Sequence, residues 1–304
     1  MKRSTAVLVA ALQGALAQGV TTSAKRGLAQ VETSEASDNH FWTSGDLTWY
    51  YNWKVTPDAG LESSSLQFMP MLWGPTNGND QSFYTQVKSM IDGGRNVSHV
   101  LGFNEPDGCG SNIYGGSCLD AQTAATTWIR EIEPLKDLGV KLGAPAVTSA
   151  PSGFNWLQNF FTACDGQCTP DFIPIHYYGD FQGLASHVGQ VNATYENMTM
   201  WVTEWAYPDE SLEDTQDFYN QSIAFFDRID YITHYSYFGG FRSSVSNVGP
   251  NSAMLTQSGD LTDIGAWYLG KAATGNVPKG GAPRVAGFAG SGLLVLAALL
   301  WCLG

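Results

Sequence analysis

The amino-acid sequence predicts an α/β fold in which eight parallel strands and their connecting helices form a (β/α)8 TIM barrel. Segments typical of strands alternate along the chain with segments typical of helices, and this alternation indicates a mainly parallel sheet. Several strand-like segments are nearly continuous apolar or aromatic runs, as expected for strands that are covered on both faces. The body of the chain has roughly 250 residues, which is the length of one such barrel, so a single domain is expected.

Seven strand-like segments are visible, at residues 48–53, 66–73, 98–104, 141–147, 171–178, 198–204 and 232–238. The eighth strand is either 27–31 or 253–256, so the sequence leaves the absolute strand numbering open. Helix-like segments lie between many of these strands, at residues 80–91, 121–138, 154–163 and 212–229. The sequence contains no Gly-x-Gly-x-x-Gly motif and no phosphate-loop motif, which argues against a nucleotide-binding doubly wound sheet.

Two of the strand-like segments end abruptly on a glutamate. One is Leu-Gly-Phe-Asn-Glu-Pro at residues 101–106, and the other is Trp-Val-Thr-Glu-Trp at residues 201–205. A carboxylate at the end of an apolar strand is costly to bury unless its charge is paired or used. Because functional residues of a β/α barrel stand at strand ends, we expect Glu105 and Glu204 to face each other. The alternative for Glu105 is a loop or helix-capping carboxylate.

Two facing carboxyl groups are the common machinery of glycoside hydrolysis. One of them has to be protonated near neutral pH, so its pKa must be raised by burial or by a negative neighbour. The other has to stay ionised, either to attack the anomeric carbon or to activate a water molecule. The pattern therefore predicts a glycosidase with Glu105 and Glu204 as its catalytic residues, and this chemistry needs no metal and no other cofactor.

Polar and aromatic side chains at strand ends complete the predicted site. Sugar rings present C–H faces that stack on aromatic rings, while buried aromatic N–H and O–H groups need hydrogen-bond partners. The amide of Asn104, directly before Glu105, is expected to bind a sugar hydroxyl. The other predicted substrate-binding residues are Trp53, Trp73, His176, Tyr178, Trp205, Tyr235 and Tyr237. For these side chains the alternative is a role in the core alone.

Five runs of residues are distinctive in combination. They are Lys-Arg-Gly-Leu-Ala at 25–29, Trp-Tyr-Tyr-Asn-Trp at 49–53, Phe-Met-Pro-Met-Leu-Trp at 68–73, and the two glutamate-containing runs. With them, nearly the whole body of the chain resembles glycoside hydrolase family 128, which contains the fungal alkali-sensitive linkage proteins of the cell wall. The resemblance implies a β/α barrel that acts on β-1,3-glucan with retention of configuration. It also implies that Glu105 is the acid/base and that Glu204 is the nucleophile.

Two features of the chain depart from this resemblance. In the wider clan the acid/base follows the fourth strand and the nucleophile the seventh, whereas Glu105 follows the third strand visible in this sequence. The stretch at residues 31–46 is polar and has no place in the expected pattern.

The predicted function is that of a retaining endo-β-1,3-glucanase that acts on cell-wall glucan, with a β-glucan polysaccharide or oligosaccharide as its partner. One alternative is a non-catalytic glucan-binding wall protein, although binding alone needs neither glutamate. Another alternative is a β-glucan transglycosylase, which uses the same chemistry and differs in the size of its products. We expect the protein to be a monomer.

The N-terminal residues have the pattern of a secretory signal peptide. Lys2 and Arg3 precede an apolar run at 6–16, and small residues of the cleavage type follow at 15–17. We assign residues 1–17 to the signal peptide, the alternative being a short buried helix. The dibasic pair Lys25-Arg26 would be a second processing site, which predicts a short propeptide at 18–26 and a catalytic barrel at 27–275.

The C-terminal residues have the pattern of a lipid-anchor signal. Three small residues at 280–282 precede a spacer at 283–292 and an uncharged tail at 293–304. Small residues, a spacer of about 8–12 residues and an apolar tail of about 10–20 define a GPI-anchor signal. We assign residues 276–304 to the spacer and this signal, with Gly280 or Asn276 as the attachment residue. A retained membrane span is the alternative, so we expect membrane contact only through the lipid.

Cysteines and sequons also suit a secreted protein. Cys302 lies in the tail, and we pair the other four cysteines locally, as Cys109–Cys118 and Cys164–Cys168. A zinc site is the alternative, but the cysteine spacings are irregular and no histidine cluster accompanies them, so no metal is expected. The predicted glycosylation sites are Asn96, Asn192, Asn197 and Asn220.

The charge balance excludes one class of partner. The formal net charge is −13, and loss of the four cations in residues 1–26 and of Arg284 would change it to −18. Such an acidic body is repelled by nucleic acids and by anionic membrane surfaces. We therefore expect no nucleic-acid partner, and a location outside the cell, at the cell surface or in the wall.

Overall fold

The computed structural model describes residues 20–31, 35–76, 81–109 and 115–279. Within these residues eight parallel strands form the barrel: β1 (Arg26–Ala29), β2 (Trp49–Tyr51), β3 (Gln67–Phe68), β4 (His99–Val100), β5 (Lys141–Leu142), β6 (Phe172–Tyr178), β7 (Thr199–Ala206) and β8 (Ile232–Tyr237). Six strands are hydrogen-bonded in the order β3-β2-β1-β8-β7-β6, and β4 pairs with β5. Parallel bridges between Met71 and Leu101 and between Gly143 and Phe172 connect the two sheets and close the ring.

The closed ring confirms the predicted fold class and resolves the strand numbering. The eighth strand is the candidate at 27–31, because β1 pairs with both β2 and β8. The other candidate, 253–256, contributes only isolated bridges at Leu255. With β1 counted, Glu105 follows β4 and Glu204 lies in β7. The apparent departure from the expected strand positions therefore disappears.

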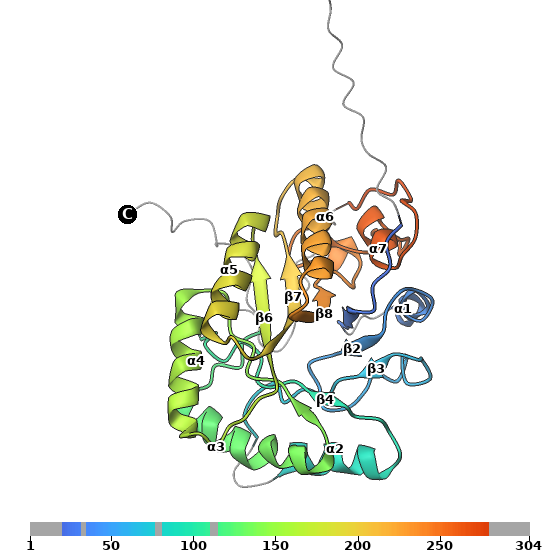
Figure 1. The fold of residues 1–304 in the computed structure, drawn as a ribbon. Coiled ribbons are helices and arrows are strands. Elements are labelled where there is room, and N and C mark those ends of the chain that lie inside the picture. Colours follow the sequence, from blue (N-terminus) through green and yellow to red (C-terminus); the bar gives the residue numbers. More distant parts are fainter. Residues whose placement is uncertain (1–19, 32–34, 77–80, 110–114, 280–304) are drawn as a thin grey trace, which may run out of the picture.

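Helices cover the outside of the barrel (Figure 1). The described α-helices are α1 (Asn39–Trp42), α2 (Ser82–Asp92), α3 (Ala121–Glu131), α4 (Pro151–Cys164), α5 (Phe181–Thr194), α6 (Leu212–Arg228) and α7 (Asp263–Tyr268). The described 3-10 helices are η1 (Ala36–Asp38), η2 (Glu133–Leu138), η3 (Ser243–Val245) and η4 (Pro250–Ser252). The predicted helix at 121–138 is divided into α3 and η2, with Pro134 at the start of η2. Proline supports the first turn of a helix and interrupts its interior.

Local sequence explains where several helices begin. Four of them have a side chain that accepts a hydrogen bond from a backbone N–H of the first turn, the preferred cap at a helix N-terminus. These caps are Asp120 for α3, Asp180 for α5, Ser211 for α6 and Thr262 for α7. Asp180 and Ser211 follow β6 and β7 within a few residues, so these two capped turns lead from strand ends into helices.

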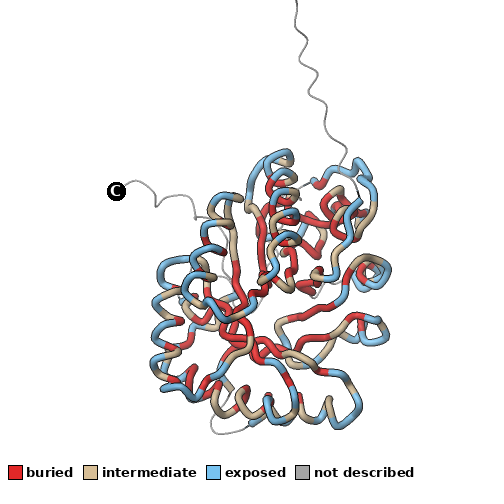
Figure 2. The backbone as a smooth tube through the Cα atoms, in the orientation of Figure 1, coloured by how far each residue is buried: buried red, intermediate tan, exposed pale blue. Residues whose placement is uncertain are grey.

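The buried side chains form two layers. The larger one lies between the strands and the helices and contains apolar residues from nearly every element. The smaller one fills the barrel, and its largest members are Trp49, Tyr51, Phe172 and Trp201. Figure 2 shows the strands as mostly buried and the outer faces of the helices as largely exposed. The strands are therefore covered on both faces, as their apolar runs predict.

The polar stretch at 31–46 is an ordered connection between β1 and β2 in its described part, which omits residues 32–34. Residues of η1 and α1 form it, and Trp42 at the end of α1 is buried. Asp38 accepts two hydrogen bonds from the guanidinium group of Arg242, at 2.7 and 2.8 Å. An ion pair to the distant loop after β8 therefore holds a segment that has few apolar residues of its own.

The predicted propeptide at 18–26 ends in two residues that contact the barrel. Arg26 is the first residue of β1 and is fully buried. Its guanidinium group donates to the carbonyl oxygen of Thr21 at 2.9 Å and contacts Asp46 at 3.2 Å. The ammonium group of Lys25 donates to the carbonyl oxygens of Phe226 and Ile229, both at 2.9 Å, near the C-terminus of α6. The dibasic pair is therefore part of the barrel, and cleavage after it would remove these contacts.

Both predicted disulfides are confirmed, Cys109–Cys118 and Cys164–Cys168. The first follows Glu105, and the second connects the end of α4 to the segment before β6. Among the described residues, no helix is both long and apolar enough to cross a membrane. The predicted signal peptide and the predicted anchor tail at 280–304 lie outside the described residues.

Candidate active site

Glu105 and Glu204 stand at the carboxyl ends of barrel strands, as predicted. The backbone N–H of Glu105 donates to the carbonyl oxygen of Ala146 at 2.7 Å, which fixes the chain after β4 against the chain after β5. Glu105 has a φ of 39°. This left-handed conformation is uncommon for a residue other than glycine, and such strain is concentrated at functional sites. The side chain of Glu204 extends from β7 into the barrel, where residues of β2 reach it.

Three hydrogen-bond donors surround the carboxylate of Glu204. The hydroxyl of Tyr178 donates to Oε2 at 2.6 Å, and the indole N–H of Trp53 donates to Oε1 at 2.9 Å. The hydroxyl of Tyr51 donates to Oε1 at 3.4 Å. Hydrogen bonds to the charged form of an acid stabilise that form, so these donors favour an ionised Glu204.

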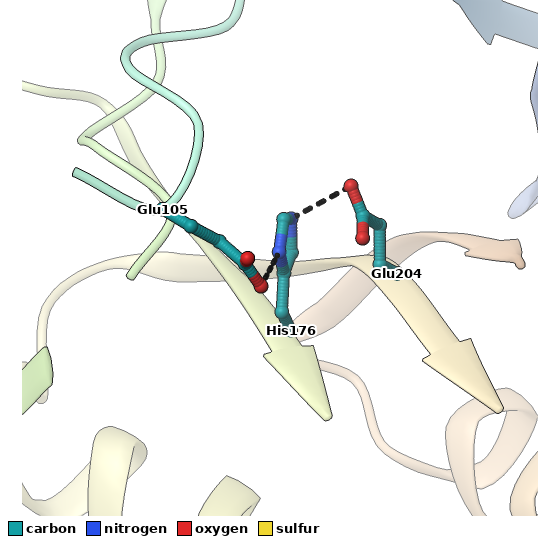
Figure 3. A group of neighbouring side chains, drawn as sticks. All are labelled: Glu105, His176 and Glu204. Atoms are coloured by element: carbon teal, nitrogen blue, oxygen red, sulfur yellow. Dashed lines mark hydrogen bonds and ion pairs between the residues drawn. The ribbon is translucent and has the colours of Figure 1, made fainter. Parts of the chain in front are cut away.

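His176 lies between the two glutamates, as Figure 3 shows. Its Nδ1 is 2.9 Å from Oε1 of Glu105, and its Nε2 is 3.5 Å from Oε1 of Glu204. The side chain of His176 is only 1% exposed. A register shift in the pairing of β6 with β7 occurs directly before His176 and places it opposite Glu204. Such an irregularity is common next to active sites, where it redirects a side chain.

The charges of this group act on one another. Burial lowers the pKa of His176. Two effects outweigh burial and raise this pKa: the negative charge of Glu204, and the hydrogen bond to Glu105 together with the negative charge of Glu105. Burial raises the pKa of Glu204 and outweighs the opposite effect of His176, and the charge of Glu105 adds to the rise, so the pKa of Glu204 is raised. The hydrogen bonds from Tyr178 and Trp53 also lower the pKa of Glu204. A cationic imidazole between two carboxyl groups therefore offsets the cost of burying them together.

The two carboxyl groups are close enough to act on one bond. One oxygen of Glu105, one nitrogen of His176 and one oxygen of Glu204 all lie within 4.8 Å of one another. The side chains of Glu105 and Glu204 are 11% and 7% exposed. Both carboxyl groups are thus almost fully removed from water, and a small part of each remains accessible.

Asn104 and Trp73 lie beside Glu105 and share one acceptor. The side-chain N–H2 of Asn104 donates to the carbonyl oxygen of Gly115 at 2.7 Å, and the indole N–H of Trp73 donates to the same oxygen at 3.2 Å. Asn104 is buried, whereas Trp73 is 39% exposed. An exposed indole that contacts the residue before Glu105 is available to stack on a ligand.

Aromatic rings form another side of the site. The ring of Trp53 packs edge-on against Phe238 at 6.0 Å, and Tyr178 packs against Phe238 at 5.7 Å. Trp53 has a φ of 57°, a second strained backbone position in the site. The sequence analysis missed Tyr51 and Phe238. The signal for Tyr51 was its position two residues before Trp53 in the strand-like segment at 48–53, where alternation predicts that both lie on one face.

Three of the predicted substrate-binding residues need correction. Trp205, Tyr235 and Tyr237 are fully buried on the outer face of the barrel, beneath the helices. The ring of Trp205 is 5.1 Å from that of Phe226 in α6. Successive residues of a strand point to opposite faces, so Trp205 points outward because Glu204 points inward. These three side chains belong to the core and do not line the site.

The described residues contain one group of side chains of metal-binding type, formed by Glu105, His176 and Glu204. A metal would need a ring nitrogen of His176 with a free lone pair. Both ring nitrogens face carboxyl oxygens, and the pKa of His176 is raised, which favours a proton on each nitrogen. The chemistry of this group is therefore that of an acid–base network.

A parallel barrel with two buried carboxyl groups at the ends of its fourth and seventh strands defines a glycoside hydrolase. The model of a family described as glycosyl hydrolase catalytic core matches residues 27–268, and the chain belongs to this family. The chain is also 31% identical over 258 residues to alkali-sensitive linkage protein 1 of Schizosaccharomyces pombe. That match covers 82% of this chain and 45% of the relative, so the chain spans about half of the length of the relative.

Solved structures of family 128 enzymes have the same fold. One is an endo-β-1,3-glucanase of subgroup II from Sorangium cellulosum, with a TM-score of 0.66 and 28% identity over 81% of this chain and 97% of that chain. Another is a curdlan-specific exo-β-1,3-glucanase of subgroup III from Blastomyces gilchristii, in complex with glucose. It has a TM-score of 0.64 and 26% identity over 81% of this chain and 97% of that chain. The resemblance to family 128 that the sequence motifs indicated is confirmed.

Proposed function

We propose that this glycoside hydrolase is a retaining endo-β-1,3-glucanase with Glu204 as nucleophile and Glu105 as acid/base. The observation that carries the proposal is the proximity of the two carboxyl groups, which have oxygens within 4.8 Å of each other. Retaining glycosidases hold their carboxyl groups about 5–5.5 Å apart, whereas inverting enzymes leave about 6.5–9.5 Å for a water molecule. The short distance therefore supports double displacement.

The hydrogen bonds support the division of roles. Glu204 accepts from Tyr178, Trp53 and Tyr51, and such donors favour the ionised carboxylate that a nucleophile requires. Glu105 lies at the end of β4, next to Asn104 and the exposed ring of Trp73. That position suits a group that protonates the departing sugar while Asn104 binds a hydroxyl of the reacting sugar.

The reaction then proceeds in two steps. The carboxylate of Glu204 attacks the anomeric carbon, and the glycosidic C–O bond breaks while Glu105 gives its proton to the departing oxygen. Glu105, now ionised, removes a proton from water, and the resulting hydroxide breaks the ester bond to Glu204. Both residues return to their starting protonation states, and each step inverts the anomeric carbon, so the net result is retention.

The identity of the glucan comes from the relatives. Two solved relatives at 28% and 26% identity are an endo-β-1,3-glucanase and a curdlan-specific exo-β-1,3-glucanase. The β-1,3 linkage is common to both, and it is the linkage that we assign to the substrate. The endo mode follows the relative of higher identity, and the sizes of the first products test it. Internal cleavage gives a range of oligosaccharides, whereas exo cleavage releases only one short product.

The proposal is tested with the purified protein and a soluble β-1,3-glucan. We expect release of reducing ends, with the β-anomer appearing first in a proton NMR time course. Glu204→Gln should lower kcat about a thousandfold or more, and Glu105→Gln about 10²–10⁴-fold. Glu196→Gln, at an exposed position before β7, is the matched control and should keep wild-type activity. An α-anomer as first product, or an active Glu204→Gln variant, would contradict the mechanism.

The same experiment separates the other functions. Products longer than the donor would identify a transglycosylase, and glucan binding without product would identify a glucan-binding protein. Linkage is tested with β-1,4- and β-1,6-glucans in parallel, on which we expect no turnover.

The proposal includes an extracellular location for a monomeric protein. Two disulfides in the described residues suit an oxidising compartment. Asn96 and Asn197 are exposed, as glycan acceptors must be, and Asn192 and Asn220 are half-buried. The signal peptide at 1–17 and the GPI anchor remain proposals. Release of the protein from membranes by a phosphatidylinositol-specific phospholipase tests the anchor, and a protein that stays bound would contradict it.

A further inference from the structure

The carbonyl oxygen of Gly115 fixes two side chains next to Glu105. It accepts from the side-chain nitrogen of Asn104 at 2.7 Å and from the indole nitrogen of Trp73 at 3.2 Å. Asn104 is 3% exposed, and its Oδ1 has no hydrogen-bond partner within the described part of the chain. Because the nitrogen of the amide is bound to Gly115, Oδ1 is the atom left to accept from a ligand.

The segment that carries Gly115 lies directly against the end of β4. The backbone N–H of Ser117 donates to the carbonyl oxygen of Asn104 at 2.9 Å. A Cβ atom added to Gly116 would lie 2.9 Å from the carbonyl oxygen of Glu105, so only glycine allows this approach. The position of the Gly115 carbonyl therefore depends on how closely this segment returns to Asn104 and Glu105.

The Cys109–Cys118 disulfide links the segment that carries Gly115 to the residues that follow Glu105. Cys109 stands four residues after Glu105, and Cys118 directly follows Ser117. The cross-link joins residues nine apart in sequence and connects residues 115–118 to the residues that follow Glu105. The second disulfide, Cys164–Cys168, connects the end of α4 to the amino-terminal side of β6, at the end of the barrel opposite the carboxyl groups.

We propose that the Cys109–Cys118 disulfide is a positioning element of the active site. It holds the Gly115 carbonyl in place, and this carbonyl orients the amide of Asn104 toward a sugar hydroxyl and fixes the indole edge of Trp73. With its N–H edge fixed, Trp73 presents its exposed ring face to the glucan chain. The inference rests on the proposed function, because it assigns these two side chains to glucan binding beside Glu105.

The two disulfides provide a matched comparison. The double variants Cys109→Ser/Cys118→Ser and Cys164→Ser/Cys168→Ser each remove one local cross-link, and both should melt at a lower temperature than the wild type. At a temperature well below both transitions, the first variant should lose about tenfold or more in kcat/KM on a soluble β-1,3-glucan. The second should stay within about twofold of the wild type. Equal kcat/KM values for the two variants would overturn the proposal.

A double-mutant cycle separates positioning from stability. Asn104→Ala should lower kcat/KM strongly in the wild type and in the Cys164→Ser/Cys168→Ser background. In the Cys109→Ser/Cys118→Ser background the same change should have little further effect, because the amide is no longer oriented there. Residues that act through one another give such non-additive effects. Full additivity in both backgrounds would show that the disulfide does not act through Asn104.

Two further measurements keep the proposal falsifiable. If the Cys109→Ser/Cys118→Ser variant does not fold, the folded wild type is reduced with dithiothreitol and alkylated, and mass spectrometry identifies the modified cysteines. Full activity with Cys109 and Cys118 alkylated would overturn the proposal. If the wild type does not hydrolyse glucan, the proposed function fails, and the same cycle is measured as the Kd of a β-1,3-gluco-oligosaccharide by tryptophan fluorescence. An unchanged Kd after loss of Cys109–Cys118 would then overturn the positioning role.

Discussion

The hydroxyl of Tyr178 donates a hydrogen bond of 2.6 Å to Oε2 of Glu204. Tyr178 ends β6 and Glu204 lies in β7, and these two strands are paired along nearly their whole length. Burial raises the pKa of Tyr178 well above its ordinary value, and the charge of Glu204 raises it further. The phenol therefore stays protonated and serves as a permanent donor to the proposed nucleophile.

Removal of this donor should move the acidic limb of the pH–rate profile. Burial raises the pKa of Glu204 and the hydrogen bond from Tyr178 lowers it, so Tyr178→Phe should raise this pKa further. Because the nucleophile must be ionised, the acidic limb of kcat/KM should move to higher pH. A hydrogen bond to a charged group contributes about 1.5–3 kcal/mol, so kcat should fall roughly ten- to a hundredfold.

Tyr177→Phe is the matched control for this change. Tyr177 is the neighbouring residue of β6, and its ring lies 5.9 Å from that of His187 on the side of α5. The control should leave both kcat and the acidic limb unchanged. The role assigned to Tyr178 would be contradicted if its variant shifted the profile no more than Tyr177→Phe does.

The protonation of His176 should depend on Glu204. Burial lowers the pKa of His176, and the charge of Glu204 is the largest influence that raises it. In the wild type the imidazole should therefore still be protonated above pH 6.5, its ordinary pKa. Glu204→Gln should lower the pKa of His176, whereas the exposed Glu196→Gln should not change it. Side-chain nitrogen NMR follows this titration, and a neutral wild-type imidazole at pH 6.5 would refute the charge network.

The alternation of strands and helices was predictable because each strand is a short apolar run with a polar boundary. The two glutamates were predictable because a charged residue at the end of such a run is unusual. Which face a neighbouring aromatic occupies was harder to predict. Tyr235 and Tyr237 share one face of β8, but only the position of β8 in the closed ring shows that this face points outward. Phe238, one residue later, reaches the site instead.

Some sequence patterns are compatible with two structures. Lys25-Arg26 is a typical processing motif in an extended segment, yet here Arg26 is buried and binds groups distant in sequence. α5 was missed because its segment contains Gly183 and Gly189 and weak helix formers. Its start depends on the cap at Asp180, and its stability depends on packing against the barrel. Both cases were decided by tertiary contacts, which local sequence does not contain.

Acid should destabilise the barrel through a half-buried histidine inside it. His234 stacks on Trp201 at 3.7 Å, and burial lowers its pKa to about 3. The unfolded chain binds a proton near pH 6.5, so this contribution to stability is present above that pH and is lost as the pH falls toward 3. The loss between pH 7 and pH 4 should be about 2–3 kcal/mol.

His234→Phe tests this contribution, because phenylalanine keeps the stacking and does not titrate. Urea unfolding at pH 7 and pH 4 should show a smaller acid-induced loss for this variant than for the wild type. The control variant His40→Phe changes an exposed position in α1. Between pH 7 and pH 4 this variant should lose as much stability as the wild type does. An identical pH dependence for wild type and His234→Phe would exclude His234 as the source of acid sensitivity.

Arg26 should be required for the stability of the barrel. Its guanidinium group donates to the carbonyl oxygens of Thr21 and Trp267 at 2.9 and 3.2 Å and contacts Asp46 at 3.2 Å. Arg26→Met would leave these oxygens without their donor, and breaking a buried ion pair costs about 3–5 kcal/mol. Lys88→Met removes an exposed ion pair within one helix and should change the free energy of unfolding far less than Arg26→Met does. Urea unfolding of both variants at pH 7 measures the difference.

The same contacts predict how the N-terminus is processed. The hydroxyl of Thr21 accepts from Arg26 at 2.8 Å, and Lys25 donates to carbonyl oxygens near the end of α6. Because this segment is bound to the barrel, a protease that cleaves after Arg26 would need the folded protein to open first. N-terminal sequencing of the mature protein should therefore find a start before Thr21. A protein that began at Gly27 and unfolded at the same urea concentration as the longer form would contradict both the processing prediction and the stabilising role of Arg26.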